Sequence, residues 1–429
     1  MQTASNLRNS SFLVYGLGTT GKSVIRFFKK NKINNFKVWD DKKKKLFKNK
    51  RPLNLISELK KVNFIVLSPG ISINNSKYKR QLYEFRDKII TDIDLVFLTK
   101  KKFKSIVVTG TNGKSTTCKL IEHILKKNNY KTFLGGNIGT PILDLKLKAN
   151  NYLIIEASSF QLAYSKFICP DYAVLLNITN DHLDWHGNKK NYINAKLGIF
   201  KLQKKNHYSL INIKLKKIFK QKKFLGKLIT PNMKNYLRIK LNIRNEYLNS
   251  NINDENVSNA FELSKLLNIN QNAFIKSVNT FRGLPHRCEI FLKKRNITFI
   301  NDSKATSFQA TKFALKSLKN IYWIVGGLPK KKDRIILKNL KKNIIKSYII
   351  GKKINFFKKQ IEKQICYYPS LTIRASLLKI FKDIKILKDK EKINILLSPA
   401  AASFDQYSNF EKRGNEYKKL VKFYAKKYL

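Results

Sequence analysis

Acidic residues are scarce in this sequence of 429 residues. It contains 27 Asp and Glu against 88 Lys and Arg, which gives a formal net charge of +61 at pH 7. A nucleic-acid-binding protein is one interpretation, because dense lysine favours phosphate backbones. The lysines are spread along the whole chain, however, and no zinc finger, helix-turn-helix or aromatic RNA-binding signature accompanies them. We therefore attribute the charge to a genome rich in A and T, whose codons favour Lys, Asn and Ile, and expect no nucleic-acid partner.

Cysteine is also scarce, and long apolar runs are missing. The four cysteines, Cys118, Cys169, Cys288 and Cys366, are far apart and lack the spacing of metal ligands, so we expect reduced thiols and a cytoplasmic protein. No apolar run reaches the roughly 18 residues that a membrane span needs. The segment Met1–Ser11 is polar and does not resemble a signal peptide. We predict a monomer without a membrane partner.

Glycine and proline are few as well, with 17 and 9 residues, and they form no linker. The chain is too long for one ordinary domain, and 43% of its residues are hydrophobic, which suffices for several cores. Apolar strand, polar turn and amphipathic helix alternate along it, which predicts an α/β protein with parallel sheets. We expect a Rossmann-like domain at residues 1–93, a central P-loop mononucleotide-binding domain at 94–283 and a Rossmann-like domain at 284–429.

A dinucleotide-binding pattern opens the first expected domain. The strand Phe12–Tyr15 leads into the glycine-rich turn Gly16–Gly21 and a helix, and a second strand, Phe36–Trp39, ends at Asp40. Glycines in such a turn let the backbone approach a pyrophosphate at the helix N-terminus. A later strand ends in Ser68–Ile71, a loop at the same sheet edge. Taken alone, this pattern also fits an NAD-dependent oxidoreductase.

A phosphate-binding loop opens the second expected domain. The strand Ser105–Val108 runs into Thr109–Thr116, and a helix follows at once. Backbone N–H groups and the helix dipole favour phosphate there, Lys114 supplies a positive charge, and Ser115 or Thr116 can reach Mg²⁺. The two glycines of the loop lie closer together than in the standard pattern.

Two further strands end in residues that could take part in chemistry. One strand ends at Glu156, which suits a Mg²⁺ ligand. Another runs into Asn177–Asp184, so His182 is expected at the same sheet edge, with His186 as a surface neighbour. Lys196 cannot be told from the many other lysines by composition. In the third domain, Asn301–Thr306 follows a strand and is expected to form a binding loop.

Together these motifs resemble the Mur ligases of peptidoglycan synthesis. The shortened loop Thr109–Thr116, Glu156–Ser159 and Asn177–His182 are similar to signatures of that family. Further motifs are similar to its D-glutamate-adding members: Gly135–Gly139, Leu284–Arg287, Asn301–Thr306, Ser398–Tyr407 and Asn409–Gly414. The DNPR-type motif of the diaminopimelate- and lysine-adding members is absent. The resemblance covers nearly the whole chain, although residues 201–251 match nothing clearly.

The resemblance implies an ATP-dependent ligase whose three domains bind the UDP group, ATP with Mg²⁺, and the incoming amino acid. Its substrates would be UDP-N-acetylmuramoyl-L-alanine, D-glutamate and ATP. In the family, ATP phosphorylates the alanyl carboxylate, the amine of D-glutamate attacks, and phosphate leaves from a tetrahedral intermediate. A folylpolyglutamate synthase is a related alternative, which the pyrophosphate turn of the first domain disfavours.

The resemblance also implies roles for single residues. The residues implied for ATP are Gly110, Thr111, Asn112, Gly113, Lys114, Ser115, Thr116, Asn256, Asn259, Arg287 and Asp302. Those implied for the UDP substrate are Gly16, Gly18, Thr19, Thr20, Asp40, Ser68, Pro69, Gly70, Asn137, Ser158 and His182. Those implied for D-glutamate are Lys304, Thr306, Lys330, Ser403, Phe404 and Phe410.

The implied catalytic centre consists of Lys114, Glu156, His182 and Lys196. Ser115 and Glu156 would serve one Mg²⁺, and His182 and a carbamylated Lys196 would serve a second. A carbamate turns the lysine cation into an anion with two oxygens, which suits a hard metal ion. Glu255 stands where family members usually have His.

Overall fold

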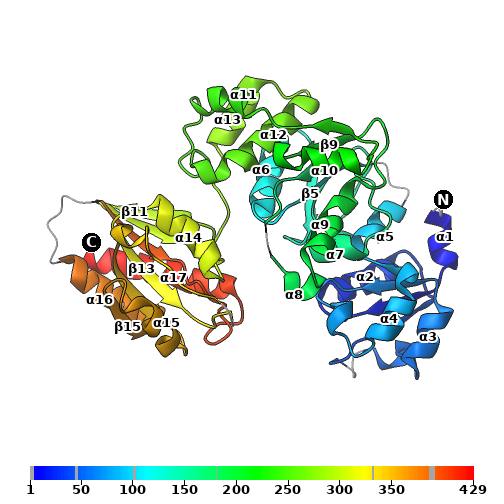
Figure 1. Cartoon of the computed structure of the whole chain (residues 1–429), viewed down its shortest axis with the longest axis horizontal. Helices are drawn as coiled ribbons and strands as arrows, with labels where there is room; N and C mark the ends of the chain where they lie inside the picture. The colour runs from blue at the N-terminus through cyan, green and yellow to red at the C-terminus, as the bar shows by residue number, and fades with distance from the viewer. Residues whose placement is uncertain (1–3, 44–46, 100–102, 180, 331–332, 386–391) are drawn as a thin grey trace. The chain divides into compact units, whose positions relative to one another are not determined.

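The computed structural model describes residues 4–43, 47–99, 103–179, 181–330, 333–385 and 392–429. The chain divides into two compact units, Met1–Phe281 and Arg282–Leu429 (Figure 1). The fold class predicted from the sequence is confirmed, because the sheets are parallel, apart from one antiparallel edge strand, with helices between the strands. The first unit contains two separate sheets. The domain boundaries that we expected after residues 93 and 283 stay a prediction.

The first sheet of the first unit has four parallel strands in the order β2-β1-β3-β4. Its strands are β1 (Phe12–Tyr15), β2 (Phe36–Trp39), β3 (Phe64–Leu67) and β4 (Ile89–Ile90). The helices around it are α1 (Ala4–Asn9), α2 (Thr19–Lys30), α3 (Leu55–Lys61), α4 (Lys79–Glu84) and α5 (Asp92–Leu98). Its central strand β1 is fully buried, so the glycine-rich turn that follows β1 starts from a rigid base.

The second sheet of the first unit has six parallel strands in the order β10-β9-β8-β5-β7-β6. The strands are β5 (Lys104–Thr109), β6 (Thr132–Gly136), β7 (Tyr152–Glu156), β8 (Tyr172–Leu175), β9 (Tyr208–Ile211) and β10 (Lys227–Ile229). The helices are α6 (Lys114–Lys127), α7 (Ser159–Tyr164), α8 (Leu183–His186), α9 (Lys189–Leu197), α10 (Lys216–Gln221), α11 (Met233–Lys240), α12 (Asp254–Leu266) and α13 (Gln271–Asn279).

Alternate residues of β5 enter opposite cores of this sheet. Ile106 and Val108 pack with α6, α12 and α13, whereas Val107 packs on the other face with α7 and α10. This alternation follows from the twofold side-chain period of a strand, and burial on both faces is typical of parallel sheets. Helices from both faces can therefore reach the carboxyl end of β5.

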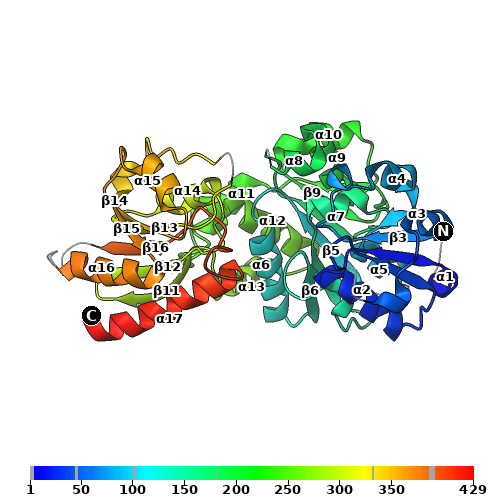
Figure 2. The ribbon, with the colours of Figure 1, turned by 90° about the horizontal axis from the view of Figure 1, so that it is seen from below.

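The second unit contains one sheet of six strands in the order β11-β12-β16-β13-β14-β15. The strands are β11 (Glu289–Lys294), β12 (Ile297–Asn301), β13 (Ile321–Gly326), β14 (Ile344–Ile350), β15 (Tyr367–Leu371) and β16 (Ile393–Leu397). The helices are α14 (Phe308–Ser317), α15 (Ile354–Ile361), α16 (Ile373–Lys385) and α17 (Phe410–Tyr428). The edge strand β11 is antiparallel to β12 and was not predicted. One core lies under α16 and α17 and the other under α14 and α15, and Figure 2 shows α17 along one face of the sheet.

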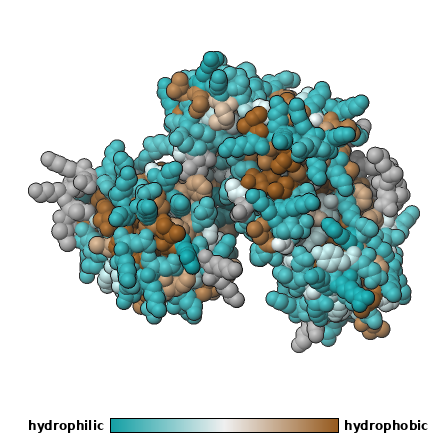
Figure 3. Space-filling view, viewed as in Figure 1, coloured by the Kyte–Doolittle hydropathy of each residue, from teal (hydrophilic) through white to brown (hydrophobic). Residues whose placement is uncertain are grey.

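Most of the surface on the face shown in Figure 3 is hydrophilic, as expected for cores that are covered by helices. The four cysteines form no disulfide, in agreement with the expected free thiols. Among the described helices, none is both long and apolar enough to cross a membrane.

Substitution of Trp323 provides a test of the packing in the core of the second unit. Its side chain is 0% exposed in β13, and its Nε1 donates to the carbonyl of Ser398 at 2.7 Å. Trp323→Ala should lower the free energy of unfolding by about 4 kcal/mol, because it leaves a large cavity and removes the hydrogen bond to Ser398. Phe423→Ala, at a site that is 63% exposed on α17, should change it by less than about 0.5 kcal/mol. Denaturant unfolding followed by circular dichroism measures both, and equal losses would contradict the buried position of Trp323.

Candidate functional site

The predicted phosphate loop lies between β5 and α6. Gly113, which directly precedes α6, has a φ of 82°, and a Cβ atom there would lie 2.1 Å from Oδ1 of Asn256. Glycine is therefore required by both the backbone conformation and the close approach of α12. Ser115 and Thr116 lie in the first turn of α6 and are buried. Because Gly113 has no side chain to cap the first N–H groups of α6, this helix end suits a phosphate.

Two lysines meet at the same backbone carbonyl in this loop. Nζ of Lys114 donates to the carbonyl of Gly110 at 2.9 Å and to that of Thr111 at 2.8 Å. Nζ of Lys196, from α9, donates to the carbonyl of Gly110 at 2.7 Å. Lys196 is 1% exposed. Burial, and next the positive charge of Lys114, lower the pKa of Lys196 to about 6, so its amine is mostly neutral at pH 7.

Glu156 lies at the end of β7, beside β5 in the sheet. Its Oε1 accepts a hydrogen bond from Nδ2 of Asn137 at 2.8 Å. Its Oε2 is buried and has no partner among the described residues. An unused buried carboxylate oxygen calls for an explanation, and a hard cation supplies one. Ser158 is buried and caps α7 through a bond from the backbone N–H of Gln161 at 3.2 Å.

His182 directly precedes α8, with a φ of 51°. Its side chain is 43% exposed, its Nε2 lies 3.3 Å from a carboxylate oxygen of Asp181, and its ring lies 4.7 Å from that of Phe160. The expectation that His186 lies at the surface is wrong. His186 is 4% exposed, its Nε2 lies 3.0 Å from Oγ of Ser159, and burial lowers its pKa to about 4. Asn180, which belongs to the same predicted motif, lies outside the described residues.

Polar residues of α12 join the phosphate loop to the end of β8. Asn177 accepts the backbone N–H of Asn112 at 2.9 Å and donates its Nδ2 to Glu255 at 2.5 Å. Glu255, noted in the sequence only as a departure from the family, is thus part of the support of the loop. Asn256 and Asn259 are 5% and 1% exposed. Oδ1 of Asn259 has no partner in the described part of the chain, so it remains an unused acceptor.

The glycine-rich turn of the first sheet is held by Asp40 and Ser68. The carboxylate of Asp40 accepts the backbone N–H groups of Leu17, Lys42 and Lys43 at 2.7, 2.9 and 2.8 Å. Although partial burial opposes it, these donors keep the pKa of Asp40 below its usual value. Oγ of Ser68 donates to the carbonyl of Gly16 at 2.9 Å. Both of these predicted residues therefore shape the turn.

Five further residues predicted for the UDP substrate lie near this turn, on the helix and loop described next. Gly18 directly precedes α2, and Thr19 and Thr20 begin that helix. Pro69 and Gly70 continue the loop after β3, where Ser68 contacts the turn. The structure thus brings the predicted loop after β3 to the predicted turn after β1, as expected for the carboxyl ends of neighbouring parallel strands.

In the second unit, a buried polar group surrounds Asp302. Asp302 accepts Oγ of Ser398 at 2.7 Å and the backbone N–H of Cys288 at 3.1 Å. Burial raises its pKa to about 6, and the neighbouring charge of Arg287 opposes that rise. His286 is 6% exposed, and its Nδ1 lies 2.9 Å from Nδ2 of Asn301.

The residues predicted for D-glutamate lie on several loops of the second unit. Nζ of Lys304 lies 4.9 Å from the centre of the Phe410 ring, so the structure brings these two together. Ser403 is buried, whereas Phe404 is 70% exposed and Lys330 is exposed. Thr306 is half-buried, two residues after Lys304.

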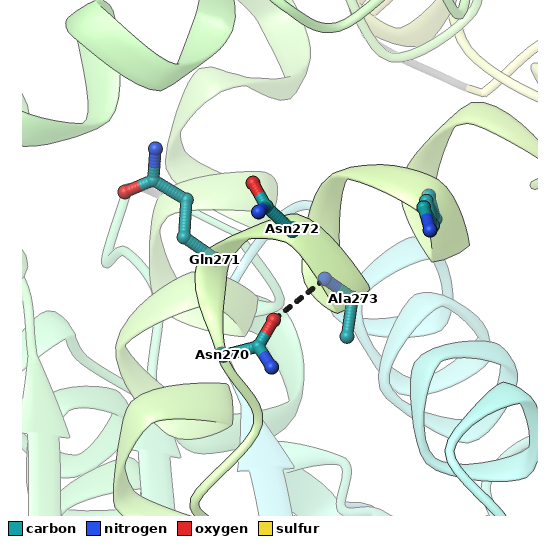
Figure 4. A pocket seen from close by; sticks show the side chains of 5 residues that line it. Asn270, Gln271, Asn272 and Ala273 are labelled. Atoms are coloured by element: carbon teal, nitrogen blue, oxygen red, sulfur yellow. Dashed lines mark hydrogen bonds between the residues drawn. The ribbon is translucent and has the colours of Figure 1, made fainter.

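One hollow of the described surface lies away from these residues. This hollow has a volume of about 450 Å³ and is lined by the first turn of α13. Figure 4 shows its side chains and the hydrogen bond in which Oδ1 of Asn270 accepts the backbone N–H of Ala273 at 2.9 Å. No predicted site residue lines it. Within the described residues, no three His, Cys, Asp or Glu side chains gather as a ready metal site. A metal ion at Glu156 would therefore need ligands of other kinds.

Comparison with known proteins places these features in one family. Residues 108–278 match the model of the Mur ligase middle domain. The chain is 34% identical to the UDP-N-acetylmuramoylalanine–D-glutamate ligase of Wolbachia sp. subsp. Brugia malayi (strain TRS), over 96% of each chain. It is 36% identical to the ligase of the same name from Rickettsia felis, over 95% of this chain and 96% of the relative.

Solved structures agree on the fold. The MurF ligase of Thermotoga maritima in complex with ADP superposes with a TM-score of 0.54 at 16% identity, over 98% of this chain and 97% of that one. The UDP-N-acetylmuramate-alanine ligase MurC of the same organism gives a TM-score of 0.55 at 15% identity, over 96% and 99% of the two chains. From the sequence relatives, the chain belongs to the Mur ligase family, among the UDP-N-acetylmuramoylalanine–D-glutamate ligases.

Proposed function

We propose that this protein joins the amine of D-glutamate to the alanyl carboxylate of UDP-N-acetylmuramoyl-L-alanine, with cleavage of ATP to ADP and phosphate, in cytoplasmic peptidoglycan synthesis. One observation carries the proposal. Relatives that bear this enzyme name are 34% and 36% identical to the chain over at least 95% of its length. The chemistry of the loop around Gly110 agrees with it. The protein would act as a monomer, with small-molecule partners and neither nucleic acid nor membrane.

The N-terminus of α6 is the place for the phosphates of ATP. The first-turn N–H groups and Lys114 hold the transferred phosphoryl group. A carboxylate oxygen of the alanyl group forms a bond to the γ-phosphorus while the bond to ADP breaks. The amine of D-glutamate then attacks the acyl carbon and loses a proton, and phosphate leaves from the tetrahedral intermediate. Preorganised donors stabilise the charge that develops in these steps.

Mg²⁺ fits the donor atoms that surround this loop. Oε2 of Glu156 is a buried acceptor without a partner in the described chain, which suits a hard cation. Ser115 and Glu156 would hold one ion, and His182 and a carbamylated Lys196 would hold the second. When bound, the ions would neutralise negative charge on the phosphates of ATP.

Lys196 has the protonation state that carbamylation requires. A neutral amine forms an N–C bond with CO₂ and releases one proton, whereas an ammonium group cannot react. Since the pKa of Lys196 is lowered to about 6, its neutral form dominates at pH 7. The product is an anion beside the cation of Lys114, and the two charges attract each other. Burial thus prepares Lys196 for the modification.

The first sheet would hold the UDP group at the turn after β1, with Asn137 and Ser158 towards the muramoyl part. The second unit would bind D-glutamate through the six residues predicted for it. Both carboxylate oxygens of Asp40 already accept backbone N–H groups.

A substrate screen tests the proposal. Purified protein with ATP, Mg²⁺ and UDP-N-acetylmuramoyl-L-alanine should release phosphate with D-glutamate and not with L-glutamate, L-lysine, diaminopimelate or L-alanine. A spectroscopic titration with UDP and with NADH separates the ligase from an oxidoreductase. Phosphate release with another amino acid, or binding of NADH and not UDP, would contradict the proposal.

Lys114→Ala should reduce phosphate release by about 100-fold or more, because a charge that stabilises the transition state is removed. Lys127→Ala is the matched control, since Lys127 is an exposed lysine at the other end of the same helix. Its rate should stay within about twofold of the wild type. Similar rates for the two variants would remove Lys114 from the assigned role.

Lys196→Ala should lose most activity, and acetate should partly restore it by filling the vacant anion site. Lys196→Arg should not be rescued, because its guanidinium keeps its charge. In the wild type, activity should also fall as the pH drops below about 6, where the amine becomes protonated and cannot hold CO₂. Steady-state rates with and without acetate measure the rescue, and the pH dependence of the wild-type rate measures the effect of protonation. Wild-type rates from Lys196→Ala without an added anion would show that the carbamate has no role.

A further inference from the structure

Arg413 is a buried cation that the proposed mechanism does not use. It lies near the start of α17 and is 1% exposed. Its Nε donates to Oγ of Ser303 at 3.0 Å, and its Nη2 donates to the carbonyls of Ser303 and Ala401 at 2.8 and 3.0 Å. Every one of these acceptors is neutral. An arginine cannot escape burial by losing its proton at neutral pH, so its charge is kept inside the second unit.

Among the described residues, the charge of Arg413 is not balanced by a direct ion pair. In the part of the chain that the structure describes, no carboxylate lies within ion-pair distance of it, and its buried Nη1 has no hydrogen-bond partner. The charge of Asp405 acts on it only from a greater distance. A buried and uncompensated charge is expensive unless something selects for it.

The guanidinium lies where several loops meet. Ser303 connects to α17 as well, since its Oγ donates to the carbonyl of Phe410 at 2.8 Å. A Cβ atom on Gly327 would lie 3.3 Å from Nη1 of Arg413, so the loop after β13 also passes close to it. In that loop, Leu328 pairs with Ala402: the backbone N–H of each residue donates to the carbonyl of the other at 2.9 Å.

These loops are the ones that carry the residues predicted for D-glutamate. The loop after β12 carries Lys304 and Thr306, the loop after β13 carries Lys330, and the loop after β16 carries Ser403 and Phe404. The sixth residue, Phe410, begins α17. Arg413 thus donates hydrogen bonds to the loops after β12 and β16, lies close to the loop after β13, and belongs to the helix that Phe410 begins.

We propose that Arg413 is the positioning residue of the D-glutamate site, which fixes these loops and supplies a buried positive charge that favours a dicarboxylate. The inference rests on the proposed function, because it takes D-glutamate as the incoming amino acid. Arg413 is too deeply buried to touch the substrate itself. Its charge acts through a poorly screened interior, where attraction to a carboxylate extends further than in water.

Two substitutions separate the charge from the hydrogen bonds. Arg413→Met removes the charge with little change in volume, and Arg413→Lys keeps the charge but loses the planar fork. Arg413→Met should raise the KM for D-glutamate by about 30-fold and lower the preference for D-glutamate over D-glutamine, as kcat/KM, by about 10-fold. Arg413→Lys should raise that KM but keep the preference. The KM values for ATP and for the UDP substrate should stay within about twofold in both.

Lys412→Met is the matched control, because it removes the same charge from an exposed position on the same helix. It should leave every KM within about twofold of the wild type. If Arg413→Met does not fold in thermal unfolding, Arg413→Lys and Ser303→Ala carry the test, and both should raise the KM for D-glutamate alone.

The outcomes distinguish this inference from the proposed function. An unchanged preference in Arg413→Met, or an equal rise of all three KM values in the folded variants, overturns the role of Arg413 and leaves the ligase activity intact. A wild-type protein that does not use D-glutamate overturns both. A selective rise for D-glutamate with a normal Lys412→Met control supports the inference.

Discussion

The carbonyl of Gly110 accepts hydrogen bonds from two lysines, and the arrangement of the site follows from this. Lys114 reaches it from the helix that the phosphate loop begins, and Lys196 reaches it from α9. Two unit charges about 4 Å apart repel by about 4 kcal/mol at an effective dielectric constant of 20. Only one of the two amines can readily stay charged. Since Lys196 is the buried one, its pKa falls, and Lys114 keeps the charge for the phosphates.

The position of β5 makes this meeting possible. Because β5 lies between β7 and β8, the residues that follow these strands, Glu156 among them, arrive beside the phosphate loop. Because both faces of the sheet are covered, α12 approaches the loop from one side and α9 from the other. The loop is therefore enclosed by elements far apart in sequence, and a glycine at position 113 is needed to leave room for Asn256.

The sequence was sufficient to predict those parts of the site that local sequence patterns determine. The phosphate loop, the acid that ends β7 and the glycine-rich turn each combine a strand with a turn and a helix, and the structure places them as expected. Lys196 could not be found in this way, because its low pKa depends on burial and on the charge of Lys114, which is far away in the sequence. His186 was misjudged for the same reason, since its polar neighbours in the sequence do not reveal its contact with Ser159. The hairpin of β11 was missed because its turn has Arg295, with a φ of 50°, where a glycine would have marked it.

The burial of two basic side chains also explains why lysine stands at one site and arginine at the other. Lys196 and Arg413 are both 1% exposed, and both donate to backbone carbonyls. A lysine amine can lose its proton when burial makes the charge unfavourable, and the neutral amine can then be modified. A guanidinium keeps its charge, so it must be held by several acceptors in fixed directions. A lysine at position 413 would lose the fork that joins Ser303 to Ala401. An arginine at position 196 would leave a permanent charge beside Lys114. Burial at Lys196 thus removes a charge from the phosphate loop. Burial at Arg413 keeps a charge in the second unit, where it can attract a dicarboxylate.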